Sequence, residues 1–324
     1  MSKILITGIV GFAGSHLADL LLQDPATELV GLMHPSHEVT HPVDATRVRI
    51  YREDILNEDA IRRLIRDVSP DAIYHLAGMA HVHESWKSRK ETIQVNFWGT
   101  FQLLEACREL PSFPRILLVG SGECYGLVPE SEQPIRETRP LMPSSPYAVS
   151  KIAQEMLGIQ YAQNEKYPVF VCRSFNHTGP RQKETFVCSR FAREIALAEK
   201  RGGAFELRVG NLDAMRDFTD VRDVVRAYQA ILSSGKPGDP YNVCSGKAVS
   251  IRDILEILIS FSSVKPNVVI DREKFRPVDI PRLQGSPAKL ESDTGWKRHY
   301  ELKTTLNDLL QFWRAEVKRT AQSS

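Results

Sequence analysis

The stretch Lys3-Ile4-Leu5-Ile6-Thr7-Gly8-Ile9-Val10-Gly11-Phe12-Ala13-Gly14 decides the fold of this 324-residue chain. Its apolar first half predicts a buried strand, and the amphipathic residues that run on to Leu22 predict a helix. Gly8 allows a tight turn, Gly11 lets the backbone approach a pyrophosphate, and Gly14 lets the helix pack closely on the strand. This order of elements predicts dinucleotide binding at the helix N-terminus, the alternative being a glycine-rich turn in an unrelated α/β protein. The residues expected to hold the cofactor are Gly8, Val10, Gly11, Phe12, Ala13 and Gly14.

Apolar runs and helical stretches alternate through the first half of the chain. After the first strand, we expect strands at residues 28–32, 48–51, 72–76, 116–119 and 169–174. This alternation predicts an α/β protein with a Rossmann-type, doubly wound parallel sheet. Beyond residue 174 polar motifs appear, which predicts a smaller C-terminal substrate-binding lobe closed by an apolar helix near residues 304–318. We expect a dinucleotide-binding domain of residues 1–172 plus about 217–244, and a lobe of residues 173–216 and 245–324.

Composition excludes several classes of protein. Lysine and arginine number 42 against 40 aspartate and glutamate, so the net charge of +2 gives no general attraction for nucleic acid or a membrane surface. The five cysteines form no CxxC pair, which predicts reduced thiols. With no run of membrane-spanning length and no signal peptide, we expect a soluble, unprocessed, cytoplasmic protein. His75, His81 and His83 lack carboxylate or cysteine partners at suitable spacing, so we expect no metal and read His75 as a core residue.

A tyrosine and a lysine four residues apart carry the predicted chemistry. In Ser145-Pro146-Tyr147-Ala148-Val149-Ser150-Lys151, the spacing places Tyr147 and Lys151 on one face of a helix capped by Ser144 or Ser145. Because a tyrosine has an ordinary pKa of about 10, acid–base work near neutral pH needs a positive charge to stabilise the phenolate, which Lys151 supplies. The helix N-terminus acts in the same direction. The alternative is an ordinary amphipathic helix with a surface lysine.

Two polar residues follow the strand expected at residues 116–119. Ser121 stands where parallel sheets bind ligands, outside the carboxyl end of a strand. We therefore expect its hydroxyl to hydrogen-bond a substrate carbonyl beside Tyr147. Glu123 is a candidate second acid or base. A turn serine and a packing carboxylate are the alternatives.

The residues placed to recognise the adenosine ribose are not diagnostic. The second strand ends in Leu32-Met33-His34-Pro35-Ser36, with neither the acid typical of NAD sites nor the arginine typical of NADP sites. His34, Ser36 and His37 suit a 2′-phosphate, which favours NADP(H) and leaves NAD(H) open, with a solvated loop as the alternative. The other expected cofactor contacts are Asp54 and Ile55 at the adenine, Leu76, Ala77 and Gly78 at a strand end, and Asn96, a buried hydrogen-bonding group.

Four arginines of the second half suit a diphosphate. Guanidinium groups bind phosphate oxygens through bidentate, charge-assisted hydrogen bonds. For any one of these arginines a surface salt bridge is the alternative. They are Arg181, Arg190, Arg216 and Arg276.

Taken together, Thr7-Gly8-x-x-Gly11-x-x-Gly14, Ser121 and Tyr147-x-x-x-Lys151 resemble the extended short-chain dehydrogenase/reductase family over nearly the whole chain. The segments that begin at Arg173, Val209, Arg216, Tyr241 and Arg276 are similar to its GDP-sugar branch. The resemblance implies a GDP-sugar substrate in the lobe. It also implies a homodimer held by a four-helix interface, for which the stretches 97–110 and 147–163 have apolar faces.

The resemblance also implies an activity, the reduction of the C4 ketone of GDP-4-keto-6-deoxy-D-mannose to GDP-D-rhamnose by a nicotinamide cofactor. In it Tyr147 protonates the C4 oxygen, Lys151 lowers the tyrosine pKa and binds the nicotinamide ribose, and Ser121 steadies the carbonyl oxygen. The remaining implied contacts are Phe175 at the cofactor, and Glu123, Asn176, Arg181, Val187, Arg190, Asn211, Arg216 and Arg276 at the GDP-sugar.

Three alternatives to this activity remain. Dehydration of GDP-mannose would use Glu123 to move protons at C5 and C6, but the loop after the second strand lacks the paired arginines of such dehydratases. An epimerase of another nucleotide sugar is the second. The third is a catalytically idle dinucleotide sensor, against which the joint presence of Ser121, Tyr147 and Lys151 speaks.

Overall fold

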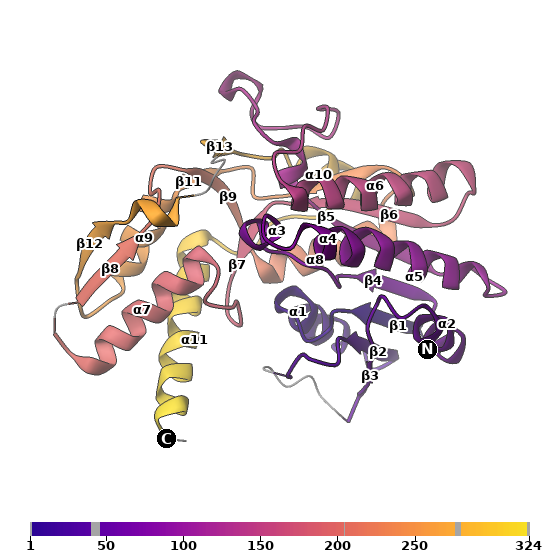
Figure 1. Ribbon diagram of the computed structural model, residues 1–324, viewed down its shortest axis with the longest axis horizontal. Helices are drawn as coiled ribbons and strands as arrows, with labels where there is room; N and C mark the ends of the chain where they lie inside the picture. Colours follow the sequence, from indigo (N-terminus) through magenta and orange to yellow (C-terminus); the bar gives the residue numbers. More distant parts are fainter. Residues whose placement is uncertain (1, 40–45, 204, 276–279, 323–324) are drawn as a thin grey trace.

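A computed structural model describes residues 2–39, 46–203, 205–275 and 280–322, and its largest element is a parallel sheet of seven strands (Figure 1). The strand order is β10-β6-β5-β4-β1-β2-β3, so the chain winds outward in both directions from β1. This confirms the predicted doubly wound sheet. The strands are β1 (Ser2–Thr7), β2 (Thr27–Met33), β3 (Val48–Arg52), β4 (Ala72–His75), β5 (Arg115–Ser121), β6 (Val169–Ser174) and β10 (Pro240–Val243).

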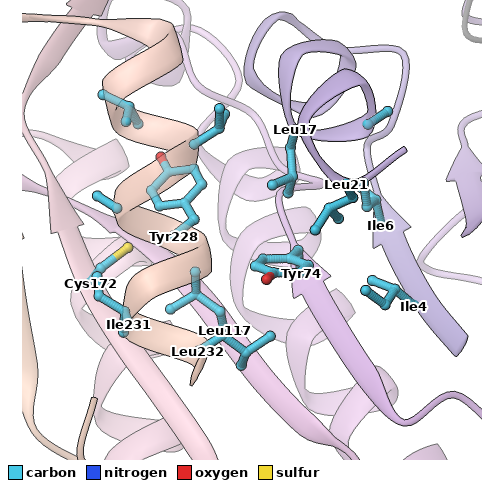
Figure 2. Close-up of a cluster of buried hydrophobic side chains, with 14 of the residues drawn as sticks. Ile4, Ile6, Leu17, Leu21, Tyr74, Leu117, Cys172, Tyr228, Ile231 and Leu232 are labelled. Carbon is cyan, nitrogen blue, oxygen red and sulfur yellow. The ribbon is translucent and has the colours of Figure 1, made fainter. Parts of the chain in front are cut away.

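Helices cover both faces of this sheet because its strands are apolar on both sides. Ile4 and Ile6 of β1 pack toward one face and Leu5 toward the other. Figure 2 shows the first face, where Tyr228 of α8 lies beside Cys172 of β6. That face carries α1 (Phe12–Leu21), α8 (Val221–Ser234) and α10 (Ala288–Thr294), and the other carries α2 (Glu58–Val68), α5 (Gly99–Arg108) and α6 (Pro146–Asn164).

Side-chain caps fix where two of these helices begin. Asn57 accepts a hydrogen bond from Ala60 N at 3.2 Å ahead of α2, and Ser145 accepts one from Ala148 N at 3.1 Å ahead of α6. Both caps were expected from the sequence. The long helical stretch around Asn96 is instead broken by a π-helical turn. In order, the segments are α3 (Val82–Ser85), α4 (Arg89–Ile93), the π-helical turn Gln94–Trp98 and α5.

A second group of elements packs beside the large sheet (Figure 1). Its three longer helices are α7 (Val187–Arg201), α9 (Ile251–Ser260) and α11 (Leu302–Gln322), which share one apolar core. Two small sheets accompany them, in which β9 (Met215–Asp220) pairs with β7 (Asn176–Thr178), β11 (Ala248–Ser250) and β13 (Arg282–Leu283), and β8 (Phe205–Val209) pairs with β12 (Pro266–Ile270). Short 3₁₀ turns occupy Gly122–Tyr125, Glu130–Glu132 and Arg272–Lys274.

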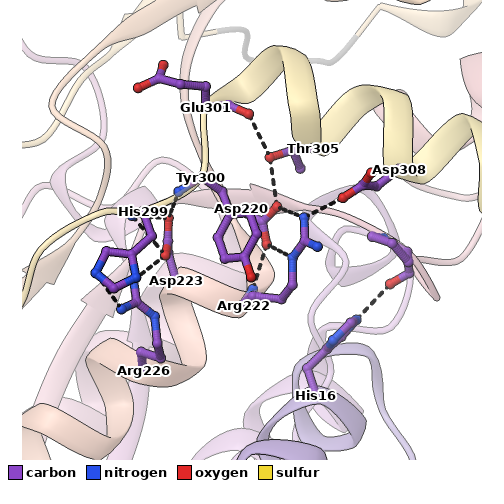
Figure 3. Close-up of polar contacts among 11 residues, drawn as sticks. His16, Asp220, Arg222, Asp223, Arg226, His299, Tyr300, Glu301, Thr305 and Asp308 are labelled. Atoms are coloured by element: carbon purple, nitrogen blue, oxygen red, sulfur yellow. Dashed lines mark hydrogen bonds and ion pairs between the residues drawn. The ribbon is translucent and has the colours of Figure 1, made fainter.

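Buried carboxylates join α8 to the C-terminal segment (Figure 3). Asp220 accepts hydrogen bonds from Arg222 N at 2.8 Å and Thr305 Oγ1 at 2.7 Å. Arg222 also pairs with Asp308 of α11 at 2.7 Å. Because the two ends of this network are side chains on different elements, it fixes α11 to the junction of β9 and α8.

The described residues contain neither a membrane-spanning helix nor a cluster of metal ligands. No helix there is long and apolar enough to cross a membrane. Nor does that part of the chain bring together three histidine, cysteine, aspartate or glutamate side chains able to hold a metal ion. Its five cysteines are all free and buried.

Candidate active site

The glycine loop between β1 and α1 has the shape that the sequence predicts. Gly8 has a φ of 75°, and a Cβ there would lie 2.9 Å from Ala77 N. A Cβ on Gly14 would overlap the Gly8 carbonyl oxygen. Helix α1 has no side-chain cap and no acidic residue in its first turn, so its N-terminal N–H groups are not satisfied by a side chain. The loop is therefore a cradle of backbone donors suited to a pyrophosphate.

The side chains of the loop residues have different surroundings, as Phe12, Val10 and Ala13 show. The Phe12 ring stacks on His177 of β7, with ring centroids 5.7 Å apart. Val10 is buried in the core of the large sheet, and Ala13 is half-buried against it. Only the backbone of Val10 and Ala13 is thus placed for a ligand.

The ends of β1 and β4 are tied together by a buried polar chain. Thr7 Oγ1 lies 2.7 Å from His75 Nδ1, and His75 Nε2 lies 2.9 Å from Thr100 Oγ1. Burial lowers the pKa of His75 to about 3, so the ring is neutral, which confirms the predicted core role. Ala77 N donates to Thr7 Oγ1 at 3.1 Å. This places Leu76 and Ala77, both half-buried, and the exposed Gly78 beside the glycine loop.

Tyr147 and Ser121 meet at the carboxyl end of β5. Tyr147 is buried, and burial raises its pKa above the ordinary value, while a hydrogen bond with the Ser121 side chain acts in the opposite direction. The charge of Glu123 raises the same pKa, so this carboxylate lies near the phenol. Ser121 Oγ also accepts a hydrogen bond from Glu123 N at 3.2 Å and so starts the turn that carries Glu123. The three predicted residues therefore form one cluster.

Lys151 lies one turn along α6 from Tyr147, as the spacing predicts. Its Nζ donates to Val119 O at 2.8 Å and to Gln154 Oε1 at 2.7 Å. Burial lowers the pKa of Lys151 to about 8. A Cβ on Gly78 would lie 3.7 Å from this Nζ, so the ammonium stands at the strand end expected to carry the cofactor. Ser121, rather than Lys151, is the group that lowers the tyrosine pKa here, and the effect of Lys151 stays a prediction.

Asn96 is the buried hydrogen-bonding group expected from the sequence. Its Oδ1 accepts from Met79 N at 2.7 Å, and its Nδ2 donates to Met79 O at 3.1 Å and Ser150 Oγ at 2.9 Å. It thus joins the segment after β4 to α6, next to Lys151. Its amide is used by the protein itself, so we read it as fixing the site.

The end of β2 carries a small polar cluster. His34 Nδ1 lies 2.7 Å from Ser36 Oγ, and His34 Nε2 lies 3.7 Å from Asp54 Oδ2. His34 and Asp54, predicted separately as cofactor contacts, are therefore neighbours. Ile55 is instead buried against Gly99 of α5. The rings of His34 and His37 lie 5.5 Å apart.

The predicted lobe residues are dispersed. Phe175 is buried beneath Gly122 and beside Tyr125, in a core cluster of its own.

Arg181 pairs with Asp19 of α1 at 2.7 Å, and the buried Arg216 donates to Ile280 O at 2.6 Å. Asn211 Oδ1 accepts from Asp213 N at 2.9 Å. Asn176 and Val187 are half-buried at the starts of β7 and α7, and Arg276 lies outside the described residues.

Arg190 differs from the other arginines. It is half-buried on α7, and within the described residues its Nε has no hydrogen-bond partner. Burial lowers its pKa, against the attraction of Glu194. A guanidinium held in this state gains from a bound anion.

Two supporting residues were missed from the sequence. Ser85 Oγ accepts a hydrogen bond from Tyr147 N at 3.2 Å, and nothing in the sequence around it signals this contact. Gln154 had a signal, because a residue three positions after Lys151 lies on the same helix face.

Comparisons with known proteins show which family has these features. A family model described as GDP-mannose 4,6 dehydratase matches residues 5–309. The chain belongs to the GDP-mannose 4,6 dehydratase family. Among the relatives it matches, the chain is similar to GDP-6-deoxy-D-mannose reductase of Pseudomonas aeruginosa, with 37% identity over 98% of both chains. It is also similar to GDP-mannose 4,6-dehydratase of Yersinia enterocolitica, with 32% identity over 91% of this chain and 89% of the relative.

Solved structures give the same result. The chain is similar to RMD from Pseudomonas aeruginosa complexed with NADPH, with a TM-score of 0.86, 36% identity and coverage of 98% of this chain and 100% of that one. It is similar to UDP-glucose 4-epimerase of Thermus thermophilus in complex with NAD, with a TM-score of 0.86, 28% identity and coverage of 96% of this chain and 99% of that one. The resemblance drawn from the sequence motifs is confirmed.

Proposed function

We propose that the protein reduces the C4 ketone of GDP-4-keto-6-deoxy-D-mannose to GDP-D-rhamnose with NADPH or NADH. The observation that carries the proposal is the buried cluster of Ser121, Tyr147 and Lys151 beside the glycine loop. Similarity over 98% of both chains to a GDP-6-deoxy-D-mannose reductase supplies the substrate class. The NADPH-bound relative and the NAD-bound relative support the two cofactors.

The site fits a dinucleotide. Gly8 packs closely on Ala77 because it has no side chain, and the uncapped N-terminus of α1 leaves backbone donors for the pyrophosphate. Lys151 would hold the nicotinamide ribose hydroxyls with the N–H group that Val119 and Gln154 do not use. His34 and Asp54 would meet the adenosine end. When bound, the reduced nicotinamide supplies the hydride for C4.

The protein's own residues then handle the proton. Tyr147 donates its phenolic proton to the C4 oxygen as negative charge develops there, and Ser121 donates a hydrogen bond to the same oxygen. Because burial raises the pKa of Tyr147, the phenol is protonated at neutral pH and ready to act as an acid. The positive charge of Lys151 stabilises the phenolate that results.

For the lobe, we propose that Arg190, Arg216 and Arg276 hold the diphosphate and that Asn176, Val187 and Asn211 contact the rest of the GDP-sugar. The half-buried Arg190 with its unpartnered Nε supports this within the described residues. Arg181 is the weakest member, because Asp19 already pairs with it. The domain division at residues 172, 217 and 244 stays part of the proposal.

A dehydratase is the second candidate, favoured by the position of Glu123 near Tyr147 and by the dehydratase relatives. One assay separates the two. The purified protein receives GDP-mannose in one tube, and enzymatically generated GDP-4-keto-6-deoxy-D-mannose with NADPH or NADH in another. Oxidation of reduced cofactor only in the second tube supports the reductase. Conversion of GDP-mannose without net cofactor use would make the protein a dehydratase.

We also propose a homodimer and a cytoplasmic location. Trp98, Val149 and Met156 are 46%, 46% and 44% exposed, and α6 packs directly beside the π-helical turn that carries Trp98. Val149, Ile152 and Met156 follow the three- and four-residue spacing of one helix face. An exposed apolar stripe of this kind supports a helical interface with a second copy. The five free cysteines support a reducing compartment.

A further inference from the structure

Residues 179–186, here called the strap, leave β7 and run to the start of α7. At their first end they are attached to α1. His16 Nε2 donates to Pro180 O at 2.9 Å, a contact visible in Figure 3, and Arg181 pairs with Asp19 at 2.7 Å. Both His16 and Asp19 lie on the helix that begins at the glycine loop.

The other end of the strap is attached to the segment that follows β4. The Phe186 ring stacks on His81, with centroids 4.5 Å apart, and Thr185 Oγ1 lies 3.5 Å from His81 Nε2. The strap therefore extends from α1 to the segment after β4. These two elements border the glycine loop and the strand end of residues 76–78, where the dinucleotide is expected.

The backbone of the strap is held in an unusual conformation. Arg181 has a φ of 73°, a left-handed value that a residue with a side chain seldom adopts. Gly179 has a φ of 150°, and a Cβ there would lie 2.9 Å from Val221 Cγ1. Such conformations persist only where neighbouring contacts impose them, and they are concentrated at functional sites.

Lys183 stands in the middle of the strap. It is exposed and makes no ion pair with any residue in the described part of the chain. Burial is the main cause of the lowered pKa of His37 and of His81, and the Lys183 ammonium lowers both further. Lys183 lies two residues before Thr185, which contacts His81 after β4, and His37 follows β2, so the charge of Lys183 acts at two strand ends beside the cofactor cradle. The remaining charges of the strap are Arg181, neutralised by Asp19, and Glu184.

We infer that the strap covers the bound dinucleotide and that Lys183 is a specificity-determining contact to one of its phosphates. The inference rests on the proposed function only for the identity of the cofactor. A lysine ammonium forms charge-assisted hydrogen bonds with phosphate oxygens wherever its flexible stem can reach. The strap would then take part in cofactor binding, whereas its one predicted site residue, Arg181, was expected at the GDP-sugar.

The test is a titration of the full chain with NADPH and with NADH, followed by fluorescence, for the wild type, Lys183→Ala and Lys183→Glu. Lys318→Ala is the matched control, because Lys318 is an exposed lysine near the end of α11. We expect the Kd for NADPH to rise about fivefold in Lys183→Ala, to rise further in Lys183→Glu, and to stay unchanged in Lys318→Ala.

The same variants are also titrated with GDP, and the three ligands together distinguish the outcomes. A loss limited to NADPH assigns Lys183 to the 2′-phosphate, and an equal loss for NADH assigns it to the diphosphate; either supports the inference. Unchanged affinity for both cofactors in both Lys183 variants would overturn it, as would a loss confined to GDP. A wild-type chain that bound neither cofactor would contradict the proposed function itself, which separates the two failures.

Discussion

Gln154 Oε1 lies 2.7 Å from Lys151 Nζ and holds the ammonium in place together with the Val119 carbonyl oxygen at 2.8 Å. Both side chains are buried, Gln154 to 1% exposure. Two neutral oxygens therefore orient the lysine from its own helix and from β5, while burial lowers its pKa to about 8. The position of the proposed catalytic lysine depends on a residue that has no role in the chemistry itself.

Gln154→Glu tests this dependence. A carboxylate in place of the amide would raise the pKa of Lys151 and offset the positive charge felt by Tyr147, so the tyrosine would become a weaker acid. We expect kcat for reduction to fall about tenfold at neutral pH and the alkaline limb of the pH profile to move to higher pH. Gln163→Glu, on the exposed side of α6, should leave the profile unchanged. An unmoved alkaline limb in Gln154→Glu would count against the coupling.

Tyr147→Phe separates binding from catalysis. The phenylalanine keeps the packing of a buried ring but removes the proton donor, so turnover should fall by a factor of about 10² to 10⁴. The Kd for NADPH should stay within about twofold, because the ring keeps its place. Tyr167→Phe is the control, since Tyr167 stacks on Phe113 away from the site. Full turnover in Tyr147→Phe would refute the assigned role, whereas a wild type that binds cofactor without turnover would be an idle sensor.

Glu123→Gln distinguishes the reductase from the dehydratase. In the reductase the proton comes from Tyr147, so the neutral amide should leave kcat for the 4-keto sugar within about threefold of the wild-type value. Since the charge of Glu123 raises the pKa of Tyr147, its removal should also move the alkaline limb of the pH profile to lower pH. The measurement is the turnover of the variant with GDP-4-keto-6-deoxy-D-mannose and, separately, with GDP-mannose. A loss of more than about a hundredfold would place Glu123 in the proton transfer.

The sequence predicted the large sheet well because its signals are local. The apolar run before Gly8, the glycine spacing and the cap at Ser145 each act within a few residues, and each element formed where it was expected. The predicted contact of Tyr147 with Ser121 follows from the fold class. A parallel sheet brings the carboxyl ends of its strands, and the helix starts that follow them, to one edge.

Other features depend on contacts between distant segments, which no local pattern encodes. Arg181 was expected at a diphosphate, yet Asp19, far away in sequence, pairs with it. Phe175 was expected at the cofactor, and its ring is buried beneath Gly122. The strap is a further example, because His16 and His81 hold it from opposite ends. The π-helical turn at Asn96 was missed because its apolar pattern does not differ from that of an α-helix.

Asp217→Asn tests how the small sheet is held. The buried carboxylate accepts hydrogen bonds from Ser245 N at 2.7 Å, Gly246 N at 3.0 Å and Gly285 N at 3.2 Å, and so joins β9 to two loops. An asparagine would turn its own N–H groups toward some of these donors. We expect the free energy of unfolding to fall by about 3 kcal/mol in urea denaturation at pH 7. Asp213→Asn, at an exposed ion pair with Arg252, should change it by less than about 1 kcal/mol. Equal effects in the two variants would show that the buried carboxylate has no special role.

Met156→Glu tests the proposed homodimer. Met156 is 44% exposed on the same helix face as Val149, and a glutamate there would have to lose its hydration in a helical interface. We expect the wild type to have the mass of two chains in light scattering after gel filtration, and the variant to have the mass of one. Ile270→Glu, which alters a residue 50% exposed on β12, should remain a dimer. A variant that kept the wild-type mass would exclude this face from the interface. Because Tyr147 and Lys151 lie on the same helix as Met156, a monomer with normal kcat would also show that the site does not need the partner subunit.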